Sequence, residues 1–374
     1  MKKLLVAICI LFSIDSSSQP DHTHKRERSL KFPDIMGYKT LKCDLHQHTV
    51  FSDGSVWPDI RVMEAMMDGL DAISLTEHLE YQPHQKDIPH PDRNRSYEIA
   101  VQEAKDHKLL IVNGSEITRR MPPGHCNAIF ITDANKLLIS DSIEVFREAK
   151  KQNAFIFWNH PNWVSQRKDG VATLTDVHRR LINEKLLDGI EVVNEHTFSD
   201  EALQIALDHN LTIMGTSDIH GLIDWEFGVP KGGHRPVTLV FAKEKSPNAI
   251  KEGLINRRTV VFYKNLLIGR NEFLVPLIQA SLKMDSAAYS GKSNVLTVTI
   301  ENITSSEFTL LNKTGFSFHD HSDIVNIKPG EKHIIQLKTL QRLINPDLKF
   351  EVLSAVYAPD KHPLITWKIK IPAQ

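Results

Sequence analysis

The sequence predicts an α/β fold, a TIM-like (β/α) barrel followed by a smaller β-sandwich domain. Two observations predict it. Through the first part of the chain, short apolar segments alternate with segments of helical periodicity, and the apolar segments end at His, Asp or Glu residues. From about Asn271 the pattern changes to short segments of period-two alternation, separated by polar turns.

The barrel elements follow one another in a regular order. After a first strand that ends near Leu45, strands are predicted at residues 71–75, 109–112, 155–158, 189–193, 211–215, 236–241 and 257–262. Helices are predicted between them at residues 57–69, 96–107, 142–152, 199–209 and 246–256. The repeated order of strand, polar residue and helix is typical of a barrel with its chemistry at the carboxyl ends of the strands.

The most informative motif stands at the end of the first strand. His46 and His48 are two residues apart on an extended chain, so their side chains project from the same side. Two imidazoles on one face can bind one metal ion. Asp53 follows in a turn that contains Gly54 and can fold back toward the same point.

A His-x-His pair is weak evidence by itself. With 19 His in 374 residues, roughly one such pair is expected by chance. The chain has three, and only the middle one ends an apolar run: His22/His24, His46/His48 and His319/His321. The later strand endings strengthen the prediction of a metal site, because five of them also carry metal-type side chains: Glu77-His78, Glu116, His160, Glu195-His196 and Asp218-Ile219-His220.

In this order, the motifs Asp-Leu-His-x-His-Thr, Ser-Asp-Gly, Thr-Glu-His, Gly-x-Glu-Ile, His-Pro and Ser-Asp-x-His resemble those of the PHP (polymerase and histidinol phosphatase) family. The resemblance covers roughly residues 38–270. It implies a distorted (β/α)7 barrel that binds three divalent ions at the strand ends. The chain looks like a secreted bacterial member with an added C-terminal β-domain.

The resemblance also implies a ligand set. The first ion would take His46, His48, Glu116 and Asp218. The second would share Glu116 and add His125 and His160, and the third would use Asp53, His78 and His220. Mixed His and carboxylate ligation suits Zn, Mn and Fe alike.

Clustered cations suit the hydrolysis of phosphate esters, because they neutralise phosphate oxygens, orient the ester and activate water. We expect a hydroxide that bridges the first two ions to attack phosphorus. Glu116 is the ligand that these two ions share. Asp218 or His220 would pass a proton to the leaving group.

Three residues are candidate substrate contacts, each with a structural alternative. Arg235 can clamp a phosphate with its guanidinium fork, or it can be solvated at the surface. Trp163 can line the pocket or pack in the core, and His196 can contact substrate or cap a helix. The loop from Tyr81 to Arg95 is expected to form a wall or lid over the site.

The expected function is that of a phosphodiesterase or phosphomonoesterase that acts on a small-molecule phosphate ester. Two alternatives remain open, a nuclease or polymerase-type exonuclease and a non-catalytic metal- or ligand-binding protein. A net charge of −1 provides no global attraction for nucleic acid. The sequence does not indicate the oligomeric state.

The predicted domains are a signal peptide (1–19), a linker (20–37), the metal-dependent hydrolase barrel (38–270) and the β-sandwich (271–374). Lys2-Lys3 and the apolar run from Leu4 to Ile14 read as a bacterial export signal, so the protein is expected to be secreted or periplasmic. No other segment reaches the length of a membrane span. Cys43 and Cys126 are expected to be buried, reduced thiols.

Overall fold

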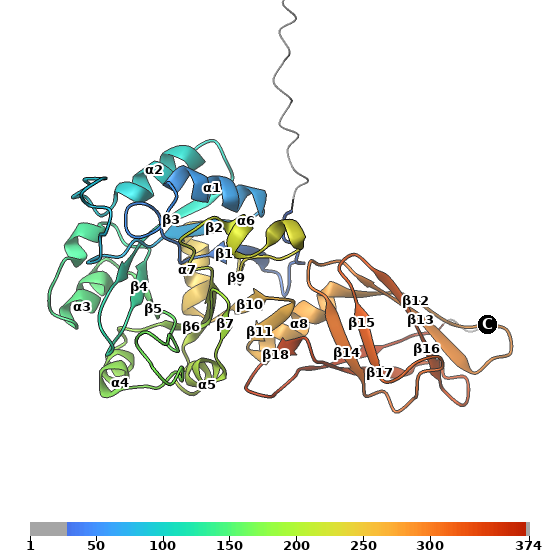
Figure 1. The fold of residues 1–374 in the computed structure, drawn as a ribbon. Helices are drawn as coiled ribbons and strands as arrows, with labels where there is room; N and C mark the ends of the chain where they lie inside the picture. Colours follow the sequence, from blue (N-terminus) through green and yellow to red (C-terminus); the bar gives the residue numbers. More distant parts are fainter. Residues whose placement is uncertain (1–27, 372–374) are drawn as a thin grey trace, which may run out of the picture.

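The computed structural model describes residues 28–371 (Figure 1). The predicted signal peptide lies outside these residues. Within them, no helix combines the length and the apolar character that crossing a membrane requires.

The first part of the barrel is parallel, as predicted. Strand β1 (Lys39–Asp44) pairs with β2 (Ala72–Leu75), which pairs with β3 (Leu110–Ile117). Helices α1 (Pro58–Met67) and α2 (Arg95–Ala104) provide the crossovers and pack against each other. All four residues of β2 are buried, as expected for a strand that is covered on both faces.

The second part contains the first departure from a regular barrel. Strand β4 (Cys126–Ile129) runs antiparallel between β3 and β5 (Phe155–Trp158), in a region where no strand was predicted. The parallel order then resumes with β6 (Gly189–Asn194) and β8 (Thr212–Thr216). The accompanying elements are η1 (Ala134–Leu137), α3 (Glu144–Lys151), α4 (Asp176–Asn183), β7 (Thr197–Phe198) and α5 (Asp200–Asp208).

Antiparallel strands complete the curled sheet on the other side of β1. Strand β9 (Val237–Ala242) runs antiparallel to β1, and β10 (Thr259–Tyr263) runs antiparallel to β9. A side chain joins β8 to β9: Thr238 Oγ1 accepts from Gly215 N at 2.9 Å and donates to Gly215 O at 2.8 Å. The predicted distorted barrel is confirmed, and its distortion lies in β4, β9 and β10. Between these elements lie α6 (Ile223–Glu226), η2 (Val229–Lys231) and α7 (Pro247–Ile255).

The C-terminal domain consists of two antiparallel sheets, which confirms the predicted sandwich (Figure 1). In β13, inward residues such as Leu296, Val298 and Ile300 are fully buried and alternate with partly exposed ones. One sheet contains β12 (Leu282–Tyr289), β13 (Val295–Asn302) and β16 (Lys332–Lys338). The other contains β14 (Phe308–Asn312), β15 (Ile324–Ile327), β17 (Asp347–Val352) and β19 (Leu364–Lys368).

The predicted domain boundary at residue 271 falls at the start of a helix. Residues there form helix α8 (Asn271–Ser281), which buries Leu274, Leu277 and Ile278 in a core shared by the barrel and the sandwich. Strand β18 (Ala355–Val356), from the C-terminal part of the chain, pairs with β11 (Leu266–Gly269) and extends the barrel sheet. The two domains are therefore joined by a continuous core.

The closure of the barrel at β8 can be tested by substitution. A Cβ atom at Gly215 would lie 2.2 Å from Cγ1 of Val261, a stiff β-branched side chain. We expect Gly215→Ala to destabilise the protein by about 1–3 kcal/mol through overpacking, measured by chemical denaturation. Gly221→Ala is the control, because nothing lies within 4 Å of the added Cβ. Equal stability of the two variants would contradict the tight contact between β8 and β10.

Candidate metal centre

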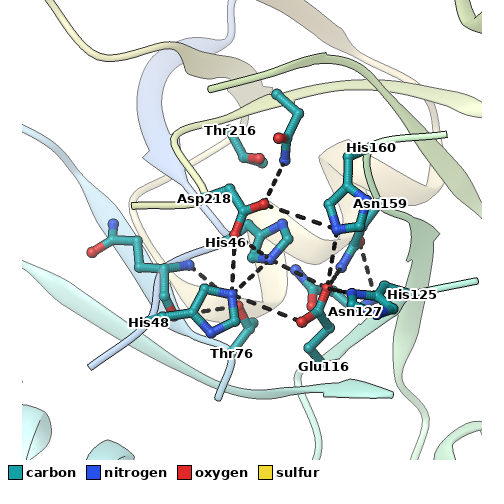
Figure 2. A network of polar contacts seen from close by, with 12 residues as sticks. His46, His48, Thr76, Glu116, His125, Asn127, Asn159, His160, Thr216 and Asp218 are labelled. Carbon is teal, nitrogen blue, oxygen red and sulfur yellow. Dashed lines mark hydrogen bonds and ion pairs between the residues drawn. The ribbon is translucent and has the colours of Figure 1, made fainter. Parts of the chain in front are cut away.

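The His-x-His pair lies at the carboxyl end of β1, with both imidazoles facing one point (Figure 2). His46 and His48 are fully buried, and their Nε2 atoms are 3.1 Å apart. Each Nε2 lies 3.0 Å from Oδ1 of Asp218. Asp218 follows β8, so the two strand ends meet as the barrel prediction requires.

Glu116 occupies the middle of the cluster (Figure 2). It extends from β3 and is fully buried. Its Oε2 atom lies 2.5 Å from Nδ1 of His78, and its Oε1 atom lies 3.1 Å from Nδ1 of His125 and 3.5 Å from Nε2 of His160. A carboxylate whose two oxygens face different imidazoles is suited to bridge two cations.

Asp53 forms a second carboxylate centre with three histidines. Its Oδ1 atom lies 3.1 Å from Nε2 of His220 and 3.7 Å from Nδ1 of His48. Its Oδ2 atom lies 3.3 Å from Nε2 of His78. The rings of His48 and His220 stack at 4.4 Å. The turn after β1 thus folds back toward the imidazoles, as the glycine at position 54 suggested.

All nine predicted ligands converge, but in a slightly different grouping. Within the described residues, three sets have ligand atoms close enough for a metal ion: His48, Asp53, His78 and His220; His46, His48 and Glu116; and His78, Glu116 and His125. His48 and His78 each belong to two sets. The two remaining predicted ligands lie next to these sets: Asp218 is 3.0 Å from Nε2 of His46 and of His48, and His160 is 3.5 Å from Oε1 of Glu116.

The residues fit divalent cations. Oε2 of Glu116 and Oδ1 of Asp218 are buried and accept no hydrogen bond, although imidazole nitrogens lie close to both. His46 Nδ1 contacts Oε1 of Glu191 at 2.8 Å, so a proton there leaves the lone pair of Nε2 facing the carboxylates. Lone pairs that face one another in a buried site are satisfied by a metal ion.

The cluster has strongly shifted pKa values. Burial alone would lower the pKa of His46, but Asp218 and Glu191 raise it well above its usual value. Burial lowers the pKa of His48 to about 3, and two neighbouring imidazoles add to this effect. Burial would raise the pKa of Glu116 and of Asp218, but the imidazoles hold both well below the usual range. The carboxylates therefore stay ionised, and a metal ion competes with a proton for His46.

Glu191, which was not among the predicted site residues, orients several ligands from behind. It is buried in β6, where its Oε1 atom contacts His46 and its Oε2 atom accepts from the backbone N–H of His160 at 2.7 Å. It also accepts from Asn194 Nδ2 at 2.8 Å. A sequence signal existed, because a carboxylate inside the apolar run 189–193 can be buried only with partners.

Two more polar residues support the ligands. Asn159 donates from Nδ2 to Oε1 of Glu116 at 2.7 Å. Glu77 accepts from the backbone N–H of Thr49 at 3.1 Å and from Ser52 Oγ at 2.6 Å, which holds the turn that carries Asp53. These contacts fix the orientation of the ligands before any ion binds.

The cluster opens into a cavity of about 120 Å³. Pockets for drug-sized ligands measure about 300–1,000 Å³, so this cavity holds little more than the reacting group. Besides predicted ligands, it is lined by Trp163, Asn194 and Glu195. Trp163 is 42% exposed and its ring lies 5.1 Å from that of His160, a position that fits the predicted contact with substrate.

The other two predicted substrate contacts do not reach this cavity. Arg235 is fully buried, and its guanidinium pairs with Asp44 at 3.2 Å and Asp68 at 2.7 Å. These two buried carboxylates hold it beneath the site, so the structure does not support its prediction as a phosphate clamp. His196 pairs with Glu226 at 2.9 Å and lines a different cavity. Cys43 and Cys126 are free and buried, as predicted.

A solved structure from Bacteroides vulgatus resembles this fold and covers both domains. It is a two-domain protein containing a predicted PHP-like metal-dependent phosphoesterase, 43% identical in sequence, with a TM-score of 0.86. The match covers 92% of this chain and 99% of that chain. This chain belongs to the PHP-like metal-dependent phosphoesterase family. A family model of Ig-like domains matches residues 282–368, within the sandwich. No curated protein matches the chain.

More distant structures share parts of the fold. PsfC from Pseudomonas syringae is 19% identical and covers 60% of this chain and 92% of its own length, with a TM-score of 0.42. The lesion-specific endonuclease PfuEndoQ from Pyrococcus furiosus is 16% identical and covers 62% of this chain and 59% of its own, also with a TM-score of 0.42. At this distance they do not bear on function.

The metal centre can be tested with the two His-x-His pairs that the structure describes. We expect His46→Ala/His48→Ala to retain less than about half of the bound divalent metal, because these imidazoles serve two of the three ligand sets. His319→Ala/His321→Ala, in the C-terminal domain, should retain all of it. Elemental analysis of the purified proteins measures both, and equal metal contents would contradict the assignment.

The role of Glu191 gives a separate prediction. Loss of a residue that orients a metal ligand typically lowers metal affinity about 10–100-fold. We expect the affinity of Glu191→Gln for Mn²⁺ or Zn²⁺ to be lower by a factor in this range, as measured by calorimetry. The variant should remain folded, as measured by circular dichroism. Unchanged affinity would show that His46 needs no support from Glu191.

Proposed function

We propose that this protein hydrolyses phosphate esters of small molecules with three divalent metal ions, Zn, Mn or Fe, at the barrel mouth. One observation carries the proposal: nine His, Asp and Glu side chains converge, and two of them are buried carboxylates that lack a hydrogen bond on one oxygen each. The complete ligand set favours an enzyme over a non-catalytic binding protein.

In this proposal the three ligand sets, together with Asp218 and His160, would hold the ions. When bound, divalent ions offset the charge of phosphate oxygens and lower the pKa of water toward neutrality. The protein excludes bulk water by burying the ligands and orients them through Glu191, Asn159 and Glu77. Trp163 forms one wall of the space that receives the ester.

His220, beside the ionised carboxylate of Asp218, is the proposed group that moves a proton to the leaving group. Both line the cavity. The side chain of His220 is 34% exposed, and its Nδ1 donates to the backbone carbonyl of Asp218 at 2.8 Å. It therefore stands at the boundary between the ligands and the solvent, where a leaving group would depart.

The small cavity also bears on the substrate. It accepts a phosphate group while the rest of the ester stays outside, which is compatible with both monoesters and diesters. We favour diesters and a secreted or periplasmic location, the latter from the N-terminal export pattern.

A substrate panel tests this function. We expect turnover of bis-p-nitrophenyl phosphate, and less of p-nitrophenyl phosphate, in the presence of Mn²⁺ or Zn²⁺. Release of p-nitrophenol measures both, and degradation of single-stranded DNA is followed in parallel. Glu116→Gln should lose about 4 kcal/mol of transition-state stabilisation, about a thousandfold in rate. Preferred hydrolysis of DNA would favour a nuclease, and no turnover with any metal would leave a binding protein.

A further inference from the structure

A larger cavity lies beside the metal centre, in the loop that follows the ligand His78. It measures about 460 Å³, nearly four times the volume at the cluster. Its lining is mostly polar or proline: Gln82, Gln85, Pro89, His90, Pro91 and Arg93. The cavity at the metal ligands holds only the reacting group. The rest of a substrate therefore needs a neighbouring space, which the larger cavity provides.

Arg93 places a positive charge at the wall of this cavity. Its Nε atom donates to Leu79 O at 3.1 Å and its Nη1 atom to His90 O at 3.2 Å. Within residues 28–371, Arg93 forms no ion pair, and Nη2 makes no hydrogen bond. Two neighbouring carboxylates have other partners: Glu80 pairs with Arg119, and Asp92 accepts from Asn94 and Asn135.

Partial burial makes this charge costly unless it has a partner. Burial lowers the pKa of the Arg93 guanidinium, and the negative charge of Glu80 offsets this lowering only in part. A guanidinium with free N–H groups at a cavity wall matches the planar geometry of phosphate or carboxylate oxygens. The same cavity offers the amides of Gln82 and Gln85 as further hydrogen-bonding groups.

The cavity is physically connected to the metal ligands. Gln82 donates to the backbone carbonyl of His78. His90 Nε2 contacts Oε1 of Gln82 at 2.7 Å and the carbonyl of Phe51 at 2.8 Å, two residues before Asp53. The walls of the cavity are thus bonded to the segments that carry His78 and Asp53.

We propose that the cavity around Arg93 binds a second anionic group of the substrate, a phosphate or carboxylate remote from the ester that is cleaved. The substrates are then phosphate esters that carry this additional negative charge. This inference rests on the proposed function for its substrate class, whereas anion binding by the cavity does not require catalysis.

Direct binding provides the first test. Metal-free protein is titrated with inorganic phosphate by calorimetry, for wild type, Arg93→Gln and Arg95→Gln. Arg95 is the matched control, since it is exposed and pairs with Glu98 at 3.2 Å. We expect Arg93→Gln to bind one phosphate fewer per chain, or to bind it at least about tenfold more weakly, with Arg95→Gln unchanged. Equal binding by all three proteins, or equal loss in both variants, would overturn the proposal.

Substrate discrimination provides the second test. 4-Nitrophenyl phosphate is compared with the same ester carrying a ring carboxylate. In wild type the carboxylate should lower KM, and Arg93→Gln should raise KM for the carboxylated ester alone by about tenfold, with kcat unchanged. If Arg93 only fastens the loop, both esters should suffer equally, which would overturn the proposal. If neither ester nor bis-p-nitrophenyl phosphate is turned over, the proposed function fails, while the phosphate titration still reports on the cavity.

If circular dichroism shows that Arg93→Gln does not fold, the KM values of the wild-type protein test the proposal. Wild type should then show the lower KM for the carboxylated ester, and this advantage should weaken as salt is raised, because the contact is between charges. Equal KM values for the two esters would overturn the proposal.

Discussion

The burial of Glu116 and Asp218 among histidines is the constraint on which the site depends. Removing an ionised carboxylate from water costs several kcal/mol unless positive charge or hydrogen bonds replace the lost hydration. Here each carboxylate keeps one oxygen without a hydrogen bond, and imidazole nitrogens surround both. Protons on the imidazoles can balance this charge, and divalent cations balance it more completely. The same arrangement that is costly to fold is therefore selective for metal ions.

The barrel supports this arrangement at a conformational cost. Three non-glycine residues at the strand ends have positive φ: His160 at 28°, Glu195 at 48° and Asp218 at 46°. Such conformations cost about 1–3 kcal/mol each. Hydrogen bonds hold all three in place, from the Asp218 N–H to His46 O at 2.9 Å, from the Glu195 N–H to Thr216 O at 3.2 Å and from the His160 N–H to Glu191. The strain lies where side chains must leave the regular path of a strand to face the ions.

The C-terminal domain contributes to the same framework from the opposite side of the sheet. Helix α8 and strand β18 join it to the barrel through a continuous apolar core. This arrangement agrees with a packing partner rather than a freely tethered module. Helix α8 also contacts β10, which packs against β8, the strand that leads to Asp218.

The sequence by itself determined the alternation of strands and helices, because strand and helix periodicity are local properties, and its resemblance to the PHP family indicated the nine ligands. It also marked the change to short β-strands near residue 271. Only the tertiary structure decided that Arg235 is neutralised by Asp44 and Asp68, that Glu191 supports His46, and that residues 271–281 form a helix. The two side-chain pairings join residues that are 145 positions apart, in the case of His46 and Glu191, and 191 positions apart, in the case of Asp44 and Arg235. Such pairings are set by the packing of the whole barrel, so no local pattern could reveal them.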